Sequence, residues 1–106
     1  MAKAKIDAQK LRQRDAMVLP FKRNIASLSI RLDKWQSSAR QGGSLAERTE
    51  AQTLARDAIA EVDTQLVKLA DVKFPAETQD KAFAGDLETM QANYSRIRQA
   101  LKAVAG

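Results

Sequence analysis

LPFKRNIASLSIRLDKW, residues 19–35, carries the pattern that decides the fold. Large apolar residues recur in it at spacings of four, three, four and three, which places them on one face of an α-helix. These residues are Phe21, Ile25, Leu28, Leu32 and Trp35. A smaller apolar group lies nearly opposite them on the same helix: Leu19, Ala26 and Ile30. The stretch therefore predicts a helix with one side for the core and a second apolar side.

The first helix extends further towards the N-terminus than this stretch. Its apolar register continues backwards through Val18 to Leu11, across Pro20. A proline inside a helix costs about 3 kcal/mol, so Pro20 either begins a new helix or kinks a long one. The continuous register favours a long helix kinked at Pro20. Residues 1–10 are expected to be a basic, partly disordered tail, and residues 11–106 a single helical domain.

A second helix is expected from Leu45 to about Val72. Gln41, Gly42 and Gly43 should end the first helix, since glycine readily adopts the left-handed conformation that closes a helix C-terminus. Ser44 and Glu47 have the spacing of a capping box at the start of the next one. An antiparallel hairpin would set the large Trp35 against small residues. The expected buried side is Ala51, Ala55, Ile59, Val62, Leu66 and Leu69.

A third helix is expected to begin at Pro75, which suits the first position of a helix, with Glu77 and Asp80 in its first turn. Steps of four and three then alternate over three heptads, as in coiled coils. The stripe is Phe83, Leu87, Met90, Tyr94, Ile97, Leu101 and Val104. Three helices joined by two short turns predict an all-α, up-down-up antiparallel three-helix bundle.

The composition removes several kinds of chemistry. The chain has no cysteine and no histidine, so thiol nucleophiles, thiolate zinc sites and the commonest general base are excluded. We expect no enzymatic activity, cofactor, metal or small-molecule substrate. No stretch approaches the roughly 18 apolar residues of a membrane span, and residues 1–20 lack the apolar run of a signal peptide. These features favour a cytoplasmic protein without membrane contact.

Four acidic and two aromatic residues are interpreted structurally. The carboxylate pairs Asp57 with Glu61 and Asp86 with Glu88 lack the Glu-x-x-His spacing of di-metal bundles and are expected to be solvated. Trp35 and Tyr94 each lie on the apolar stripe of a helix. Both are expected in the core, with a polar edge reaching the surface.

Positive charge gathers at the front of the chain. Residues 1–40 contain ten lysine or arginine residues and three aspartates. Cations at a helix N-terminus oppose the helix dipole, so helix stability does not explain them. They would bind nucleic-acid phosphates or an acidic protein surface, or they would balance Asp71, Glu77 and Asp80 inside the bundle or simply keep the protein soluble. The residues concerned are Lys3, Lys5, Lys10, Arg12, Arg14, Lys22 and Arg23.

The second apolar side of the first helix is the other candidate for function. Ile30 would be exposed among cations if the bundle closes on the major stripe. Alternatively, the first helix buries both of its sides between the other two. The expected partner-binding residues are Leu19, Arg23, Ala26, Ile30 and Lys34. The leading hypothesis is a non-enzymatic protein-interaction module, such as an adaptor, inhibitor or assembly factor, that binds an acidic protein or itself as a homo-oligomer. The alternative is a nucleic-acid-associated protein.

Overall fold

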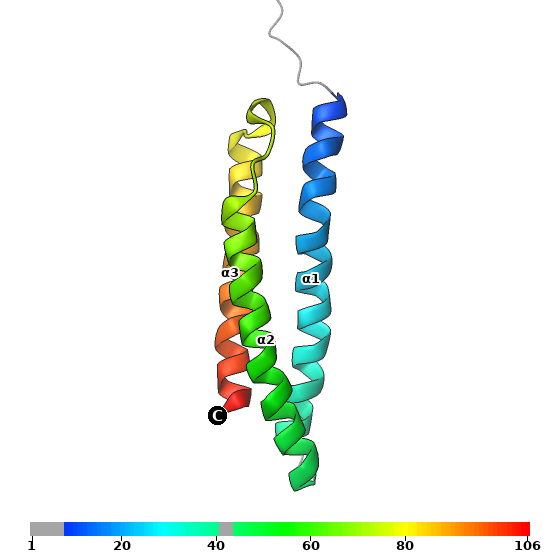
Figure 1. Ribbon diagram of the computed structural model, residues 1–106, viewed down its shortest axis with the longest axis vertical. Helices are drawn as coiled ribbons and strands as arrows, with labels where there is room; N and C mark the ends of the chain where they lie inside the picture. The colour runs from blue at the N-terminus through cyan, green and yellow to red at the C-terminus, as the bar shows by residue number, and fades with distance from the viewer. Residues whose placement is uncertain (1–7, 41–43) are drawn as a thin grey trace, which may run out of the picture.

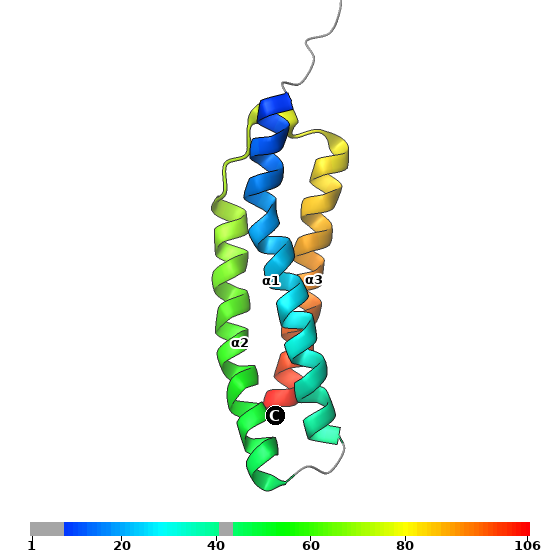
Figure 2. The same cartoon turned by 90° about the vertical axis from the view of Figure 1, so that its right-hand side faces the viewer.

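The computed structural model describes residues 8–40 and 44–106, which contain three α-helices and one short 3-10 helix. The order is α1 (Ala8–Arg40), α2 (Leu45–Asp71), η1 (Ala76–Thr78) and α3 (Lys81–Ala105). The helices run up, down and up, and α1 lies against both of the others (Figures 1 and 2). The predicted all-α three-helix bundle is confirmed.

The first helix is a single long element. It spans 33 residues with Pro20 inside it, which confirms the long helix that the apolar register predicted. Packing of its apolar side against two other helices offsets the backbone hydrogen bond that the proline ring removes. Residues 1–7 and 41–43 lie outside the described part, and with them lie most of the expected tail and the expected glycine closure.

The second helix begins as its cap predicts. The Oγ of Ser44 accepts a hydrogen bond from the backbone N–H of Glu47 over 3.1 Å. This contact satisfies one of the backbone donors that the first turn of a helix leaves free. The helix ends at Asp71, one residue before the expected end, because Val72 has extended dihedral angles.

The start of the third helix was predicted wrongly. Pro75 has an extended ψ of 127° and precedes η1, while α3 begins six residues later at Lys81. The hydroxyl of Thr78 donates to the carbonyl of Pro75 over 2.7 Å, which closes η1 as a separate turn. The side chain of Asp80 then caps α3 by accepting from the N–H of Phe83 over 2.8 Å. Asp80 is therefore the cap of α3 and not part of its first turn.

The core follows the apolar stripes. Trp35 is buried and lines the same hollow as Ala51, so a large side chain on α1 lies beside a small one on α2, as predicted. Ile25, Ile59, Leu66 and Leu87 are only partly buried and pack around the core. The fully or almost fully buried apolar side chains include Val18, Phe21, Leu28, Leu32, Ala55, Val62, Leu69, Phe83, Met90, Tyr94, Ile97 and Leu101.

Candidate interaction face on the first helix

The second apolar side of α1 faces solvent. Ile30 is 72% exposed and Leu19 is 42% exposed, while Ala26 between them is also exposed. The flanking cations Arg23 and Lys34 are exposed as well. Although α1 lies against both other helices, it buries one side and leaves this one open. We call these five residues the outer face of α1.

The outer face belongs to the most basic helix of the bundle. The sequence of α1 contains eight lysine or arginine residues and two aspartates. Within residues 8–40 and 44–106, Arg23 and Lys34 form no ion pair. Lys34 lines the same hollow as Glu47 and Glu50 of α2, and both cations lie beside an apolar strip that water does not solvate well.

Two of the basic residues at the front of α1 are used inside the bundle. Lys10 forms an ion pair with Glu77, and this contact lowers the pKa of the Glu77 carboxyl. The guanidinium of Arg14 donates to the carbonyl of Thr78 over 2.9 Å and lies 4.4 Å from the centre of the Phe83 ring. The predicted internal balance thus holds for Glu77.

The remaining basic residues and the other two acids are placed differently. Arg12 and Lys22 are exposed on α1, and Lys3 and Lys5 lie outside the described residues. Asp80 is the cap of α3, and Asp71 lines a hollow between α1 and α2. Of the basic front within the described residues, Lys10 and Arg14 thus have contacts in the bundle, while Arg12, Lys22 and Arg23 are exposed on α1.

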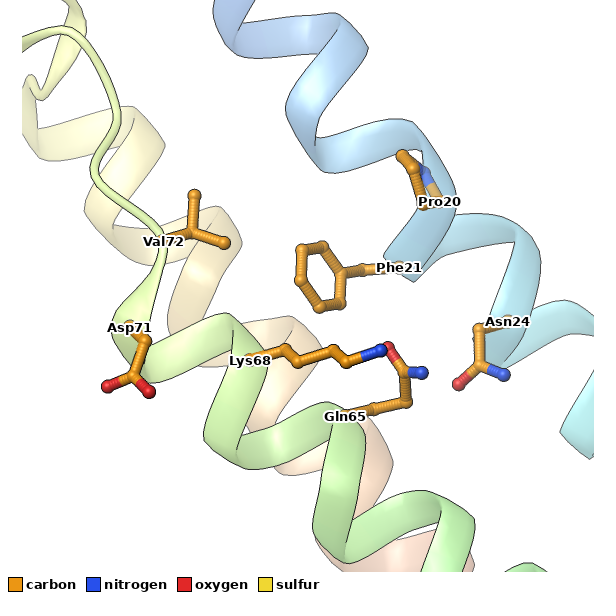
Figure 3. Close-up of a pocket in the computed structure, with 7 residues that line it drawn as sticks. All are labelled: Pro20, Phe21, Asn24, Gln65, Lys68, Asp71 and Val72. Carbon is orange, nitrogen blue, oxygen red and sulfur yellow. The ribbon is translucent and has the colours of Figure 1, made fainter.

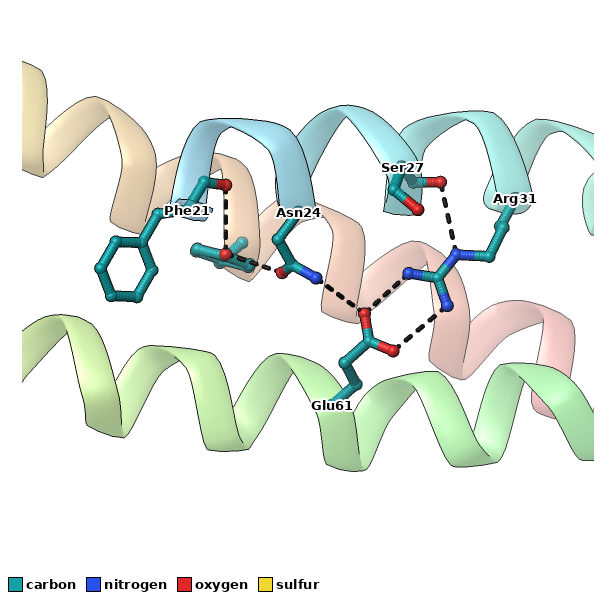
Figure 4. A network of polar contacts seen from close by, with 6 residues as sticks. Phe21, Asn24, Ser27, Arg31 and Glu61 are labelled. Carbon is teal, nitrogen blue, oxygen red and sulfur yellow. Dashed lines mark hydrogen bonds and ion pairs between the residues drawn. The ribbon is translucent and has the colours of Figure 1, made fainter. Parts of the chain in front are cut away.

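A network of polar contacts joins all three helices at mid-height (Figure 4). Glu61 of α2 accepts from two guanidinium nitrogens of Arg31 on α1, over 2.7 and 3.2 Å. It also accepts from the amide of Asn24 over 2.9 Å. The hydroxyl of Tyr94 on α3 donates to the amide oxygen of Asn24 over 2.7 Å. A bidentate pair and two side-chain hydrogen bonds thus hold α1, α2 and α3 in one register.

Two expectations are corrected by this network. Glu61 was expected to be solvated, but it is half-buried and bonded to two side chains of α1. Tyr94 was expected to reach the surface with its hydroxyl, but its exposed fraction is 0%. The network itself was not predicted. The sequence feature that could have indicated it is the spacing of Asn24 and Arg31. These polar residues are seven positions apart and therefore lie on one edge of the buried stripe.

The network also shifts two acid–base equilibria. The hydrogen bonds from Arg31 hold the pKa of the Glu61 carboxyl below its usual value, against the opposing effect of partial burial. Burial raises the pKa of Tyr94 to about 12, and the nearby negative charge of Glu61 adds to this effect. Glu61 is therefore ionised and Tyr94 neutral at physiological pH. This arrangement stabilises the bundle and supplies no group with a pKa near 7.

Shallow hollows flank α1 on both sides. One of about 590 Å³ lies between α1 and α2 and is lined by Pro20, Phe21 and Val72 together with polar groups (Figure 3). On the other side, between α1 and α3, two hollows of about 430 and 260 Å³ share Ile25 and Asn93 in their lining. The α1/α3 side is therefore grooved over several helical turns.

Among residues 8–40 and 44–106, no three acidic side chains come together in a way that could hold a metal ion. No helix in that part of the chain combines the length and the apolar character needed to cross a membrane. A comparison with protein-family models, curated proteins and solved structures found no match to this chain.

Proposed function

We propose that this protein is a non-enzymatic helical interaction module, an adaptor, inhibitor or assembly factor, that binds a protein partner through the outer face of α1. The observation that carries the proposal is the 72% exposure of Ile30 in the C-terminal half of a basic helix. Burying one such side chain contributes about 2 kcal/mol to an interface. An isoleucine ringed by polar and charged groups is typical of an interface anchor.

The charge of the face defines the chemistry of the partner. Arg23 and Lys34 lie on either side of Ile30 along the helix and form no ion pair among the described residues. A partner with an apolar groove and acidic edges would bury Ile30 and pair with both cations. We propose a cytoplasmic location for this interaction.

The aromatic residues favour a protein partner over a nucleic acid. Base stacking needs exposed rings, whereas every aromatic side chain of this protein is buried. They are Phe21, Trp35, Phe74, Phe83 and Tyr94. In addition, Lys10 and Arg14 already have contacts within the bundle, which leaves fewer cations for phosphates.

The proposal is tested by affinity capture from the organism that encodes the protein, followed by quantitative mass spectrometry. Ile30→Glu should reduce recovery of the partner at least tenfold or so, since it places a charge at the anchor. Val67→Glu is the matched control, because Val67 is 61% exposed on α2, away from the outer face. If no protein is captured in an Ile30-dependent manner, the proposal is wrong.

The nucleic-acid alternative has its own test. Random duplex and single-stranded DNA are titrated with the protein at several salt concentrations, with fluorescence anisotropy as the readout. Binding that weakens steeply with salt and disappears in the Arg12→Glu, Lys22→Glu variant would favour phosphate contacts. We expect no binding at low salt, because all five aromatic rings are buried and because Lys10 and Arg14 have contacts within the bundle.

A further inference from the structure

A second stripe on α1 lies next to the outer face, towards α3. Its members occupy an arc of about 60° around the helix, and all of them are exposed. They are Asp15, Lys22, Ala26, Ser29, Asp33 and Arg40. We call them the α1 stripe. Ala26 belongs to both surfaces, so the α1 stripe and the outer face form one continuous exposed side.

The α1 stripe is complementary to itself when it is read in reverse. Its centre falls between residues 27 and 28, and the small Ala26 and Ser29 are equally far from that point. Lys22 and Asp33 also lie at equal distances on either side of the centre, and so do Asp15 and Arg40. Each charge therefore has the opposite charge at the mirrored position.

We propose that two copies of this chain associate through the α1 stripe, with their first helices antiparallel. This arrangement sets Lys22 beside Asp33 of the second copy, and the two-fold symmetry repeats the pair. The small residues at the centre allow the helices to approach closely. A parallel arrangement would instead place Lys22 beside Lys22 of the second copy, which costs free energy.

The third helix repeats the same kind of symmetry beside α1. On the edge of α3 that faces the α1/α3 groove, three pairs of residues lie at equal distances on either side of position 91. One pair is two alanines, one is an acid with a base, and one is two polar residues. They are Ala82 with Ala100, Asp86 with Arg96, and Thr89 with Asn93. We call them the α3 stripe. The parallel course of α1 and α3 lets one two-fold axis relate both stripes to those of a second copy.

The two stripes are level with each other in the structure. Lys22 and Asp86 line one hollow of the α1/α3 groove, and Asp33 and Arg96 line the neighbouring one. The charge patterns thus run side by side. In the dimer each end of the interface would combine Lys22 and Asp86 of one copy with Asp33 and Arg96 of the other, two positive and two negative charges.

Most of these charges have no ionic partner in the isolated chain. Lys22, Asp33, Asp86 and Arg40 form no ion pair within residues 8–40 and 44–106, while Asp15 is bonded to Arg14 beside it. Association would give these charges opposite charges at close range. It would also bring Ile30 over Ala26 of the second copy, because the two positions lie at almost the same height in the antiparallel pair.

The size of the surface agrees with a dimer that uses both stripes. From residue 15 to residue 40 the α1 stripe is about 38 Å long, and a helix contact about 10 Å wide would cover roughly 400 Å² per copy. Standard interfaces bury about 800 Å² per partner. The α3 stripe alongside supplies a strip of similar width. The inference goes beyond the proposed function, because it names a second copy as the partner and places the contact on the two stripes and not on Arg23 and Lys34 of the outer face.

Charge reversal gives a sharp test by light scattering and analytical ultracentrifugation. The unaltered chain should show twice the 11.7 kDa mass of the monomer. Lys22→Asp alone sets two aspartates against each other, and Asp33→Lys alone sets two lysines against each other, so each should raise the dimer dissociation constant at least tenfold or so. A mixture of the two variants restores opposite charges at every contact and should form the heterodimer.

Asp57→Lys on α2 is the matched control for these variants, since Asp57 is exposed on another helix and forms no ion pair in the described chain. It should leave the dimer unchanged. Circular dichroism confirms that each variant remains helical. Dimers that persist in both single variants, or a mixture that does not associate, would overturn the proposal.

The orientation is tested with spin labels, because the chain has no cysteine of its own. Ser37→Cys places a label on the exposed side of α1, outside the α1 stripe. In the antiparallel dimer the two labelled positions are separated by about 28 Å along the helix axis, whereas in a parallel dimer they would be at the same height. A short distance between labels would contradict the arrangement.

The outcomes separate this inference from the proposed function. A concentration-independent monomer together with an Ile30-dependent protein partner would overturn the homodimer and leave the interaction module intact. A dimer that fails the charge-reversal test would show that association uses another surface. A monomer that captures nothing in an Ile30-dependent manner would contradict both proposals.

Discussion

The hydroxyl of Tyr94 donates to the amide oxygen of Asn24 over 2.7 Å, which links the last helix to the first inside the bundle. The amide nitrogen of Asn24 then donates to Glu61 over 2.9 Å, so the second helix joins the same chain of contacts. Apolar stripes tolerate sliding of one helix along another, whereas directional contacts do not. This link therefore fixes the relative heights of α1 and α3, on which the alignment of the α1 stripe with the α3 stripe depends.

Replacing Tyr94 by phenylalanine should lower the free energy of unfolding by about 1 to 2 kcal/mol. The ring keeps its packing, but the half-buried amide oxygen of Asn24 loses its donor. Urea denaturation at one fixed protein concentration measures the loss. Ser38→Ala is the control, since it removes an exposed hydroxyl bonded to the carbonyl of Lys34 and should change stability by less than about 0.5 kcal/mol. Equal effects of both variants would contradict a role for the network.

The raised pKa of Tyr94 predicts a loss of stability at alkaline pH. Its folded value of about 12 exceeds the ordinary value of 10.0, so the folded state binds the phenolic proton more tightly than the unfolded state. The neutral Tyr94 therefore makes its full contribution to the free energy of unfolding below pH 10. This contribution is lost as the pH rises from 10 to about 12. A pKa difference of two units between the folded and unfolded states corresponds to a loss of about 3 kcal/mol in the free energy of unfolding.

The measurement compares unfolding free energies across this pH range in the unaltered chain and in Tyr94→Phe. Lysines titrate in both proteins, so the difference isolates Tyr94. The chain contains one tyrosine, and its tyrosinate absorbance therefore reports the pKa directly. A midpoint near 10 in the folded protein would show that the hydroxyl is solvated, against the buried contact with Asn24.

The sequence predicted those features that depend on neighbours along the chain. The three helices follow from apolar periodicity, and the Ser44 cap from a spacing of three residues. The position at which α3 begins was predicted wrongly, because Pro75 and Asp80 are both residues that commonly begin a helix. The choice between Pro75 and Asp80 depends on contacts between residues far apart in the sequence. One of them is the hydrogen bond that Arg14 donates to the carbonyl of Thr78.

In the candidate site, too, features that depend on nearby residues were predicted and features that depend on distant residues were not. The exposure of Ile30 follows from its position opposite the core stripe, and it was predicted. The hydrogen bonds of Glu61 were not predicted, because they depend on Arg31, which is thirty residues away on another helix. Arg14 occupies a position of the apolar register between Leu11 and Val18 and Arg12 does not, but only the structure shows the Phe83 ring that Arg14 contacts. Long-range packing therefore decides which charges remain available for function.

Arg14 and Arg12 are predicted to differ sharply in their effect on stability. Arg14→Ala removes a cation–π contact with Phe83 and leaves the carbonyl of Thr78 without its guanidinium donor, which should cost about 1 to 2 kcal/mol. Arg12→Ala removes the same charge from an exposed position and should cost less than about 0.5 kcal/mol. Thermal denaturation of both variants measures the difference. Equal stability would mean that Arg14 is as free as Arg12 to serve a partner.

Gly85→Ala should stabilise the protein. Gly85 lies inside α3, and a Cβ added there would meet nothing within 4 Å. Alanine is favoured over glycine in a helix interior by about 1 kcal/mol, so the melting temperature should rise by about 5 °C.

Ala84→Gly is the reverse control for Gly85→Ala. Ala84 is the exposed neighbour of Gly85 in α3, so glycine there should lower the melting temperature by a similar amount. Gly85 also lies at the edge of the α3 stripe, next to Asp86. Comparing melting temperatures in dilute and concentrated protein therefore distinguishes two effects, because helix propensity acts at any concentration, whereas interference with a second copy appears only where the dimer forms. A gain that is present on dilution and reversed at high concentration would place Gly85 in the interface, whereas a loss at both concentrations would contradict the open environment of this position.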